Sequence, residues 1–190
     1  VVAGAFAPAK TMPLVEQLFG GLPGTARAAD PGLPAGVPAL STVVRETQKD
    51  DVELARVSFA WPSPKHFAKG DAELDLLSSA LTATKASRLT ERLVWKDKLA
   101  QKVDAYQASG ALGSRFVIDV LVRPGVDPAK IEPVILAELE KVRKDPLPEA
   151  ELSRAKNGIE TALFTRLESV RERASLLNAY EEETGDPGYL

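Results

Sequence analysis

Cysteine is absent from the 190-residue chain, and histidine occurs once, at His66. The absence of cysteine excludes disulfides, thiolate zinc sites, iron–sulfur clusters and cysteine nucleophiles. With a single histidine as well, the chain has very few ways to hold a transition metal. The formal net charge of −3 argues against a protein built to neutralise a row of phosphates, so we expect no nucleic-acid partner. No run approaches about 18 consecutive apolar residues, which predicts no membrane span.

A signal peptide is not recognisable at the start of the sequence. The apolar run at 1–6 has no basic residue ahead of it and is too short for a signal-peptide core. We expect this run to be a β-strand and the chain to be a fragment of a longer protein. The lack of cysteine suits an exported or periplasmic bacterial protein but does not assign a compartment.

The composition is that of a globular protein, with 44% apolar and 27% charged residues. A chain of this length can bury about 70% of its unfolded surface, which is enough for a hydrophobic core. We therefore expect a single domain over 1–190. Within it, residues 20–38 contain five glycines and four prolines, which predicts a linker without regular structure.

The first half of the chain shows both helical and strand patterns. Leu14, Val15, Leu18 and Phe19 recur at helical spacing. Two runs rich in valine and threonine, 39–47 and 52–60, are typical of strands, and the polar residues between them predict a hairpin. Pro62 and Pro64 are expected to end the second strand.

From Asp71 onward, a helix is predicted first, then a shorter helix over 87–95 and a second hairpin. The hairpin strands contain 103–106 and 116–122, with a turn at 110–113. Three apolar stripes predict that the last third is helical, and Gly185 is a candidate C-cap. Hairpins mixed with helices indicate an α+β fold: a largely antiparallel sheet with helices packed on one face.

A search for catalytic chemistry finds no convincing constellation. The glycines at 20–24 lack the Lys-Ser/Thr of a phosphate-binding loop, and no G-x-S-x-G sequence occurs. His66 lies between prolines and a helix and is interpreted as an exposed loop residue. The acidic run 181–183 is interpreted as a solvated helix face. The residues therefore predict no catalytic, cofactor-binding or metal-ligating residue in this chain.

Several segments together resemble the second domain of M16 (pitrilysin/insulinase-type) metallopeptidases. The opening run 1–6 with 18–23 is similar to the strand–helix unit at the start of that domain. Glu151, Leu152, Ala155 and Lys156 resemble its E-L-x-x-A-K helix. The remaining matching positions are Ser87, Arg88, Leu89, Leu93, Val94, Leu99, Ala100, Val103, Ala105, Ser169, Arg173, Ala174, Leu177, Tyr180 and 185–187. Their order and spacing make the match specific across most of the chain.

The resemblance implies the fold of M16 peptidases and LuxS/MPP-like metallohydrolases, in which two similar α+β domains pair as a clamshell. In this family the zinc site lies in the catalytic domain, on a helix that carries H-x-x-E-H. Two histidines one turn apart bind the ion, and the glutamate between them activates the zinc-bound water. A chain with one histidine cannot supply this motif, so we expect any zinc in a partner domain.

Many non-catalytic domains of the family also supply an arginine and a tyrosine near the substrate, from a segment of the form L-R-x(5)-L-A-Y. Alignment of Leu93 and Leu99 places Val94 at the arginine position and Gln101 at the tyrosine position. The sequence therefore departs from the family where the assisting residues would be. Ser87, Arg88, Leu99, Glu151 and Lys156 are interpreted as architectural residues.

Two hypotheses follow from the resemblance. In the first, the chain is the non-catalytic half of an M16 peptidase and forms one wall of a chamber that encloses peptides. Its partner would be a catalytic M16 domain, in the same chain or in a separate subunit. In the second, the chain is a binding or assembly scaffold of the same fold whose partner has also lost zinc, like the core subunits of a respiratory complex.

Overall fold

The structure is a computed structural model that describes residues 1–24, 40–110 and 113–189. Its contacts divide the chain into two compact units. We call residues 34–160 the sheet unit, and residues 1–33 with 161–190 the terminal unit.

The described part of the sheet unit contains an antiparallel sheet with the strand order β1-β3-β2. The strands are β1 (Arg56–Ser63), β2 (Ala100–Ala108) and β3 (Ser114–Val122). Strands β2 and β3 form the hairpin that the sequence predicts, although residues 111 and 112 of its turn lie outside the described residues. Strand β1 returns from a distant part of the sequence to pair with the other side of β3.

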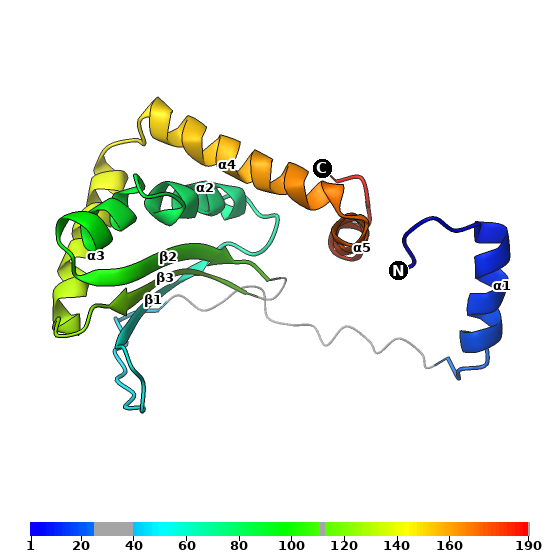
Figure 1. The fold of residues 1–190 in the computed structure, drawn as a ribbon, viewed down its shortest axis with the longest axis horizontal. Helices are drawn as coiled ribbons and strands as arrows, with labels where there is room; N and C mark the ends of the chain where they lie inside the picture. The colour runs from blue at the N-terminus through cyan, green and yellow to red at the C-terminus, as the bar shows by residue number, and fades with distance from the viewer. Residues whose placement is uncertain (25–39, 111–112, 190) are drawn as a thin grey trace. The chain divides into compact units, whose positions relative to one another are not determined.

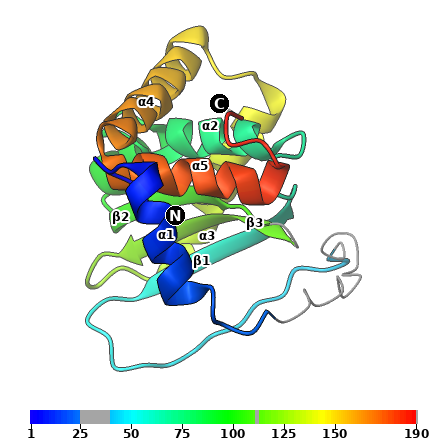
Figure 2. The ribbon, with the colours of Figure 1, turned by 90° about the vertical axis from the view of Figure 1, so that its right-hand side faces the viewer.

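The helices of the sheet unit are α2 (Asp71–Thr82), the π-helical turn η1 (Thr90–Lys96), the 3₁₀ turn η2 (Pro128–Lys130) and α3 (Ile131–Lys144). Helix α4 (Glu149–Glu168) begins in this unit. Helix α2 lies over the sheet, next to β2 (Figures 1 and 2). The helix expected from Asp71 is therefore confirmed, as are the helical last third and the α+β class. The shorter helix predicted over 87–95 is displaced along the chain, because η1 is π-helical and covers residues 90–96.

The hydrophobic core lies on one face of the sheet. The alternation of β3 turns Phe116, Ile118, Val120 and Val122 toward the helices, and all four are buried. The helical side chains packed with them are Leu81 of α2, Leu89 just before η1, Leu93 of η1, and Ile131 and Ile135 of α3. Because one face of three strands meets three helical segments, the core is continuous from the hairpin to α3.

Local signals in the sequence fix where these helices begin. The Glu73 side chain accepts a hydrogen bond from the Gly70 N–H at 3.0 Å, which satisfies a free donor at the start of α2. Gly70 has φ of +101°, a conformation that favours glycine. Before α3, the Asp127 side chain accepts from the Ala129 N–H at 2.9 Å.

The terminal unit contains α1 (Pro8–Phe19), the end of α4 and α5 (Val170–Thr184). Helix α5 is capped at both ends: Ser169 accepts from the Glu172 N–H, and Gly185 adopts φ of +73°. The predicted C-cap role of Gly185 is thus confirmed. Among the described residues of this unit, no side chain is buried.

Two expected strands are absent from the described residues. Residues 1–6 form no strand, and Gly4 there has φ of +132°, outside the strand region. Residues 40–47 also form no strand, so the hairpin predicted with 52–60 is wrong; residue 39 lies outside the description. A valine-rich run becomes a strand only when a neighbouring strand pairs with it, and none of the described strands pairs with this one. Its contact with the rest of the sheet unit includes an ion pair between the Arg45 side chain and Glu132, at 2.5 Å.

The second predicted strand is displaced along the chain. Strand β1 begins at Arg56 rather than residue 52 and continues through Pro62 to Ser63. Proline is tolerated because β1 is an outer strand, and the pairing directs the nitrogen of Pro62 away from β3. Of the predicted linker at 20–38, only residues 20–24 are described, and they follow α1 without regular structure beyond a turn.

Candidate functional site

His66 does not belong to a catalytic or metal-binding arrangement in the described residues. It lies in the loop between β1 and α2 and is half-buried, not exposed as the sequence suggested. Its ring stacks on Phe67 with 3.9 Å between centroids. Nowhere in the described ranges do three or more histidine, aspartate or glutamate side chains gather as a metal site would require.

A buried carboxylate, Asp71, organises this loop from the first turn of α2. It accepts hydrogen bonds from the Phe67 N–H at 3.0 Å, from Gln107 Nε2 at 2.9 Å and from Ser109 Oγ at 2.6 Å. Burial raises the pKa of Asp71, but the hydrogen bonds from Ser109, Gln107 and Phe67 outweigh it and hold that pKa below its usual value. Asp71 therefore ties the loop and the end of β2 to α2.

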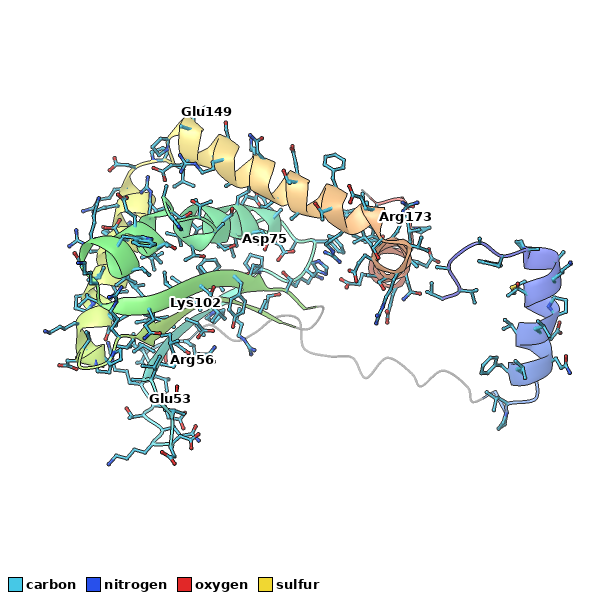
Figure 3. The ribbon with its side chains drawn as sticks, viewed as in Figure 1. Glu53, Arg56, Asp75, Lys102, Glu149 and Arg173 are labelled. Atoms are coloured by element: carbon cyan, nitrogen blue, oxygen red, sulfur yellow. The ribbon has the colours of Figure 1, made fainter. Side chains whose placement is uncertain are left out.

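A second buried carboxylate, Asp119, lies on the sheet face opposite the core. It accepts hydrogen bonds from Nε and Nη2 of the Arg56 guanidinium, from Ser58 Oγ at 2.5 Å and from the Tyr106 hydroxyl at 3.2 Å. Arg56, Ser58 and Tyr106 come from the two strands that flank β3, so Asp119 links the whole sheet. Figure 3 labels Arg56 and Lys102, which also lie on this face.

The electrostatics of this cluster are those of a satisfied ion pair. Burial raises the pKa of Asp119, but hydrogen bonds from Arg56 and Ser58 and the charge of Arg56 bring it below the usual value. The pKa of Tyr106 is raised, chiefly by burial and then by the negative charge of Asp119. A deprotonated, fully hydrogen-bonded aspartate is a poor general acid or base, so the cluster is structural.

The residues that carry the family resemblance form an anchor between helices. Arg88 donates to Glu151 from Nε at 2.6 Å and from Nη2 at 3.2 Å, and both side chains are largely buried. Ser87 donates to the Ser79 carbonyl at 3.2 Å and accepts from the Thr84 N–H. These contacts support the architectural interpretation of Ser87, Arg88 and Glu151.

The other proposed architectural residues differ from each other. Leu99 packs against the core, whereas Lys156 is exposed on α4 and does not support that interpretation. Glu181, Glu182 and Glu183 are exposed on the last turns of α5, as expected for a solvated face.

The positions aligned with the assisting arginine and tyrosine are Val94 and Gln101. Val94 packs against the core, and its carbonyl accepts from Arg123 Nη2 at 3.2 Å. Gln101 is exposed near the start of β2. The nearest residues of the expected types are engaged elsewhere: Arg92 pairs with Asp97 at 2.6 Å, and Tyr106 donates to Asp119. The two aligned positions, Val94 and Gln101, therefore supply neither an arginine nor a tyrosine, and Tyr106 instead meets Arg56 at Asp119.

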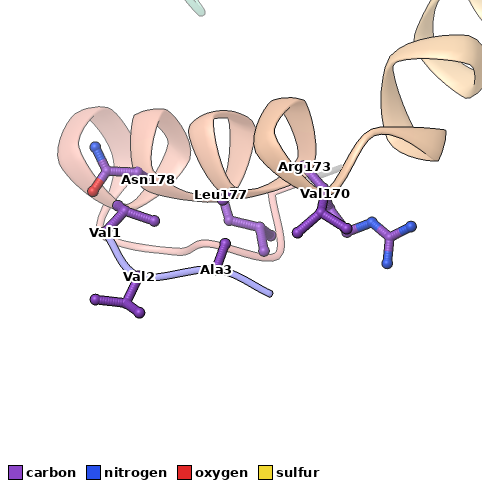
Figure 4. A pocket seen from close by; sticks show the side chains of 8 residues that line it. Val1, Val2, Ala3, Val170, Arg173, Leu177 and Asn178 are labelled. Atoms are coloured by element: carbon purple, nitrogen blue, oxygen red, sulfur yellow. The ribbon is translucent and has the colours of Figure 1, made fainter. Parts of the chain in front are cut away.

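A cavity of about 320 Å³ lies in the terminal unit, between the first residues and α5 (Figure 4). It is lined mainly by apolar side chains, among them Val2 and Leu177. Its one charged lining residue, Arg173, donates to the Leu167 carbonyl from Nε at 3.1 Å and Nη2 at 2.7 Å. Without a nucleophile or an acid–base pair, this cavity is not a candidate catalytic site.

The two buried aspartates were not predicted from the sequence. Asp119 lies between two core residues of β3 and therefore on the other face of the sheet. A polar residue at such a position is also expected when that face is exposed to solvent, so the sequence pattern does not reveal that Asp119 is buried. Asp71 looks like an ordinary acidic residue in the first turn of a helix.

Within the described residues, none of the helices combines the length and apolar character that crossing a bilayer requires.

Known proteins agree with this architecture. The sequence model of the family described as peptidase M16 inactive domain matches residues 1–159. A zinc protease, PqqE from Helicobacter pylori, is 30% identical over 132 residues, which span 70% of this chain and 30% of that protein. The chain therefore spans less than a third of the curated relative that it matches.

Solved structures show the same fold. A protease from Helicobacter pylori superposes with a TM-score of 0.76 at 25% identity, covering 94% of this chain and 43% of that one. A chain of complex III from Candida albicans, at 15% identity, superposes with a TM-score of 0.70 over 95% of this chain and 43% of its own length. The sequence match and the α+β architecture together show that this chain belongs to the peptidase M16 inactive-domain family.

Proposed function

We propose that this chain is the non-catalytic domain of an M16 zinc metallopeptidase and forms one wall of a chamber that encloses peptide substrates. A zinc-bearing M16 domain, in the same longer protein or in a separate subunit, would form the other wall and cleave the peptide. The match of 1–159 to the inactive-domain family carries this proposal. The similarity to a zinc protease supports the link to proteolysis.

The residues of this chain do not fit a zinc site of the family type. One histidine in the whole sequence cannot provide the paired imidazoles of H-x-x-E-H. His66 also lies in a loop rather than on a helix. We therefore assign this chain no catalytic, cofactor-binding or metal-ligating residue and place the zinc in the partner.

Reconstitution tests the proposal. The chain and the M16 domain with H-x-x-E-H encoded in the same or an adjacent gene would be purified separately and mixed. We expect cleavage of a quenched peptide by the mixture that a chelator abolishes, with little cleavage by either part alone. Zinc-dependent cleavage by this chain alone, or full activity of the partner without it, would contradict the proposal.

The second candidate is a non-proteolytic scaffold of the same fold. Val94 and Gln101 at the positions of the assisting residues favour it, because the substrate contacts of the family would be missing. The similar chain from complex III belongs to an assembly that is not named as a protease. Absence of H-x-x-E-H from the same and neighbouring genes, together with a stable complex that cleaves nothing, would support this candidate over the first.

A further inference from the structure

The two outer strands of the sheet present different edges. In an antiparallel pair, the residues that bond across alternate with residues whose N–H and C=O point away. The Val122 N–H donates to the Ala55 carbonyl at 2.9 Å, which sets this alternation for β1 and β3. It follows that Val57 and Phe59 bond to β3, whereas the main-chain groups of Ser58 and Ala60 point outward.

The outer edge of β2 is partly closed by α2. By the same alternation, the Ala105 N–H points away from β3, and it donates to Thr82 Oγ1 of α2 at 2.9 Å. Helix α2 lies next to β2 in the sheet unit (Figure 1). A side-chain cap on an edge N–H, with a helix beside it, leaves little room for a further strand.

The outer edge of β1 has no such cap. In the described ranges, no hydrogen bond reaches the main-chain N–H of Ser58 or Ala60 from outside the β1–β3 ladder. Residues 40–55, which precede β1, form no strand that could pair with it. Unpaired main-chain donors and acceptors in a row are the chemistry that recognises another strand.

The side chains of β1 define what such a strand would carry. Val57, Phe59 and Trp61 lie on the core side and are only partly buried, and the rings of Phe59 and Trp61 stack with centroids 6.1 Å apart. On the opposite face lie Arg56 and Ser58, bound to Asp119. In an antiparallel pair, directly opposed residues share one face of the sheet.

We propose that the outer edge of β1 binds an extended segment of another polypeptide, which adds to the sheet as an antiparallel strand. The residues of that segment that bond to Ser58 and Ala60 are polar, and the alternate residues are apolar and pack beside Phe59 and Trp61. This inference goes beyond the proposed function, because it requires no zinc-bearing partner, and its failure would leave the reconstitution experiment unaffected.

Amide hydrogen exchange of the free chain, followed by NMR, is the first test. The amides of Val57 and Phe59 are expected to exchange slowly because they bond to β3, and those of Ser58 and Ala60 are expected to exchange about as fast as in an unstructured peptide. Protection of Ser58 and Ala60 in the free chain would show that another segment or a second copy already occupies the edge. That result would overturn the proposal.

The second test uses a short, blocked peptide of alternating threonine and valine with a lysine at each end. In the proposed register, the threonine N–H groups bond to β1 and the valine N–H groups point outward. A peptide N-methylated at its valines should therefore slow exchange of the Ser58 and Ala60 amides by about tenfold or more. The same peptide N-methylated at its threonines should give no protection. Equal effects, or the reverse order, would overturn the proposal.

A variant pair tests the edge from the side of the protein. Ala60→Pro removes one outward N–H and, like Pro62, takes no donor from the bond ladder with β3. Ala60→Val keeps that N–H and is the matched control. We expect the valine-methylated peptide to bind about tenfold more weakly to Ala60→Pro and unchanged to Ala60→Val, with the Ile118 amide still protected in both. Equal binding would overturn the proposal, and the peptide comparison decides the question by itself if Ala60→Pro does not fold.

Discussion

The sheet unit and the terminal unit use their apolar residues in different ways. Of the described residues, the largest fully buried side chains all lie in the sheet unit, on α2, just before η1, on η1, on β3 and on α3. In the terminal unit, α1 carries Leu14, Leu18 and Phe19 at helical spacing, yet more than half of each side chain is exposed. The comparison teaches that an amphipathic pattern specifies a helix without supplying the surface that the helix would cover.

The stability of the two units therefore has different sources. Burial of apolar surface contributes most of the folding free energy of a domain, and here it is concentrated on one face of the sheet. The described helices of the terminal unit depend more on local interactions, such as the Ser169 and Gly185 caps of α5. Substitutions of the same kind should thus have unequal effects in the two units.

The largest expected difference is between Ile118→Ala and Leu18→Ala. Ile118 is fully buried, so its truncation removes packed methylene groups and leaves a cavity, at a cost of about 2–5 kcal/mol in the free energy of unfolding. Leu18 is 71% exposed, so the same truncation should cost less than about 0.5 kcal/mol. Urea denaturation followed by circular dichroism measures both. Equal losses in the two variants would show that Leu18 is buried in solution and would break the comparison.

The parts of the fold that were predicted correctly have strong local signals. The helix at Asp71, the helices of the last third, the β2–β3 hairpin and the Gly185 cap all follow from periodicity or from a capping residue. The errors concern strands: residues 1–6 and 40–47 have β-forming composition but no pairing partner in the described residues. Strand formation depends on a neighbour that can be distant in sequence, and β1 pairs with β3 across more than 50 residues.

The candidate site could be predicted only as far as residue types allow. One histidine and no cysteine exclude a zinc site with two histidine ligands or with thiolate ligands, because folding cannot supply a residue type that the chain lacks. The hydrogen bonds of Asp119 could not be foreseen, because they require Arg56, Ser58 and Tyr106 to meet from two other strands. Likewise, the Arg88–Glu151 pair joins residues 63 positions apart.

The second prediction compares an ion pair from each unit. Arg88 and Glu151 meet in a two-point geometry with side chains only 19% and 27% exposed, whereas Arg166 and Glu172 of the terminal unit are 3.6 Å apart and 54% and 45% exposed. We expect Arg88→Ala to lower the free energy of unfolding by about 2 kcal/mol, because Glu151 is left without its partner. Arg166→Ala should cost no more than about 0.5 kcal/mol.

A double-mutant cycle separates the pair from the loss of side-chain packing. The coupling between Arg88→Ala and Glu151→Ala should be about 1 kcal/mol, against nearly zero for Arg166→Ala and Glu172→Ala. If the exposed pair coupled as strongly as the Arg88 pair, burial would not be what distinguishes the two units.

The smallest expected effect is a difference in acid sensitivity. Hydrogen bonds from Arg56 and Ser58 outweigh the effect of burial and hold the pKa of Asp119 below its value in the unfolded chain. The ionised carboxylate therefore stabilises the fold fully above the unfolded pKa of about 3.9, and this contribution is lost as the pH falls toward the folded pKa. Asp119→Asn should lower the free energy of unfolding by about 1 kcal/mol near neutral pH, and the difference in this free energy from the unsubstituted chain should narrow below about pH 4.

Glu182→Gln, on the exposed face of α5, is the control from the terminal unit and should leave the pH dependence of the free energy of unfolding unchanged. A gap for Asp119→Asn that stayed constant from neutral to acid pH would mean that the charge of Asp119 does not stabilise the sheet.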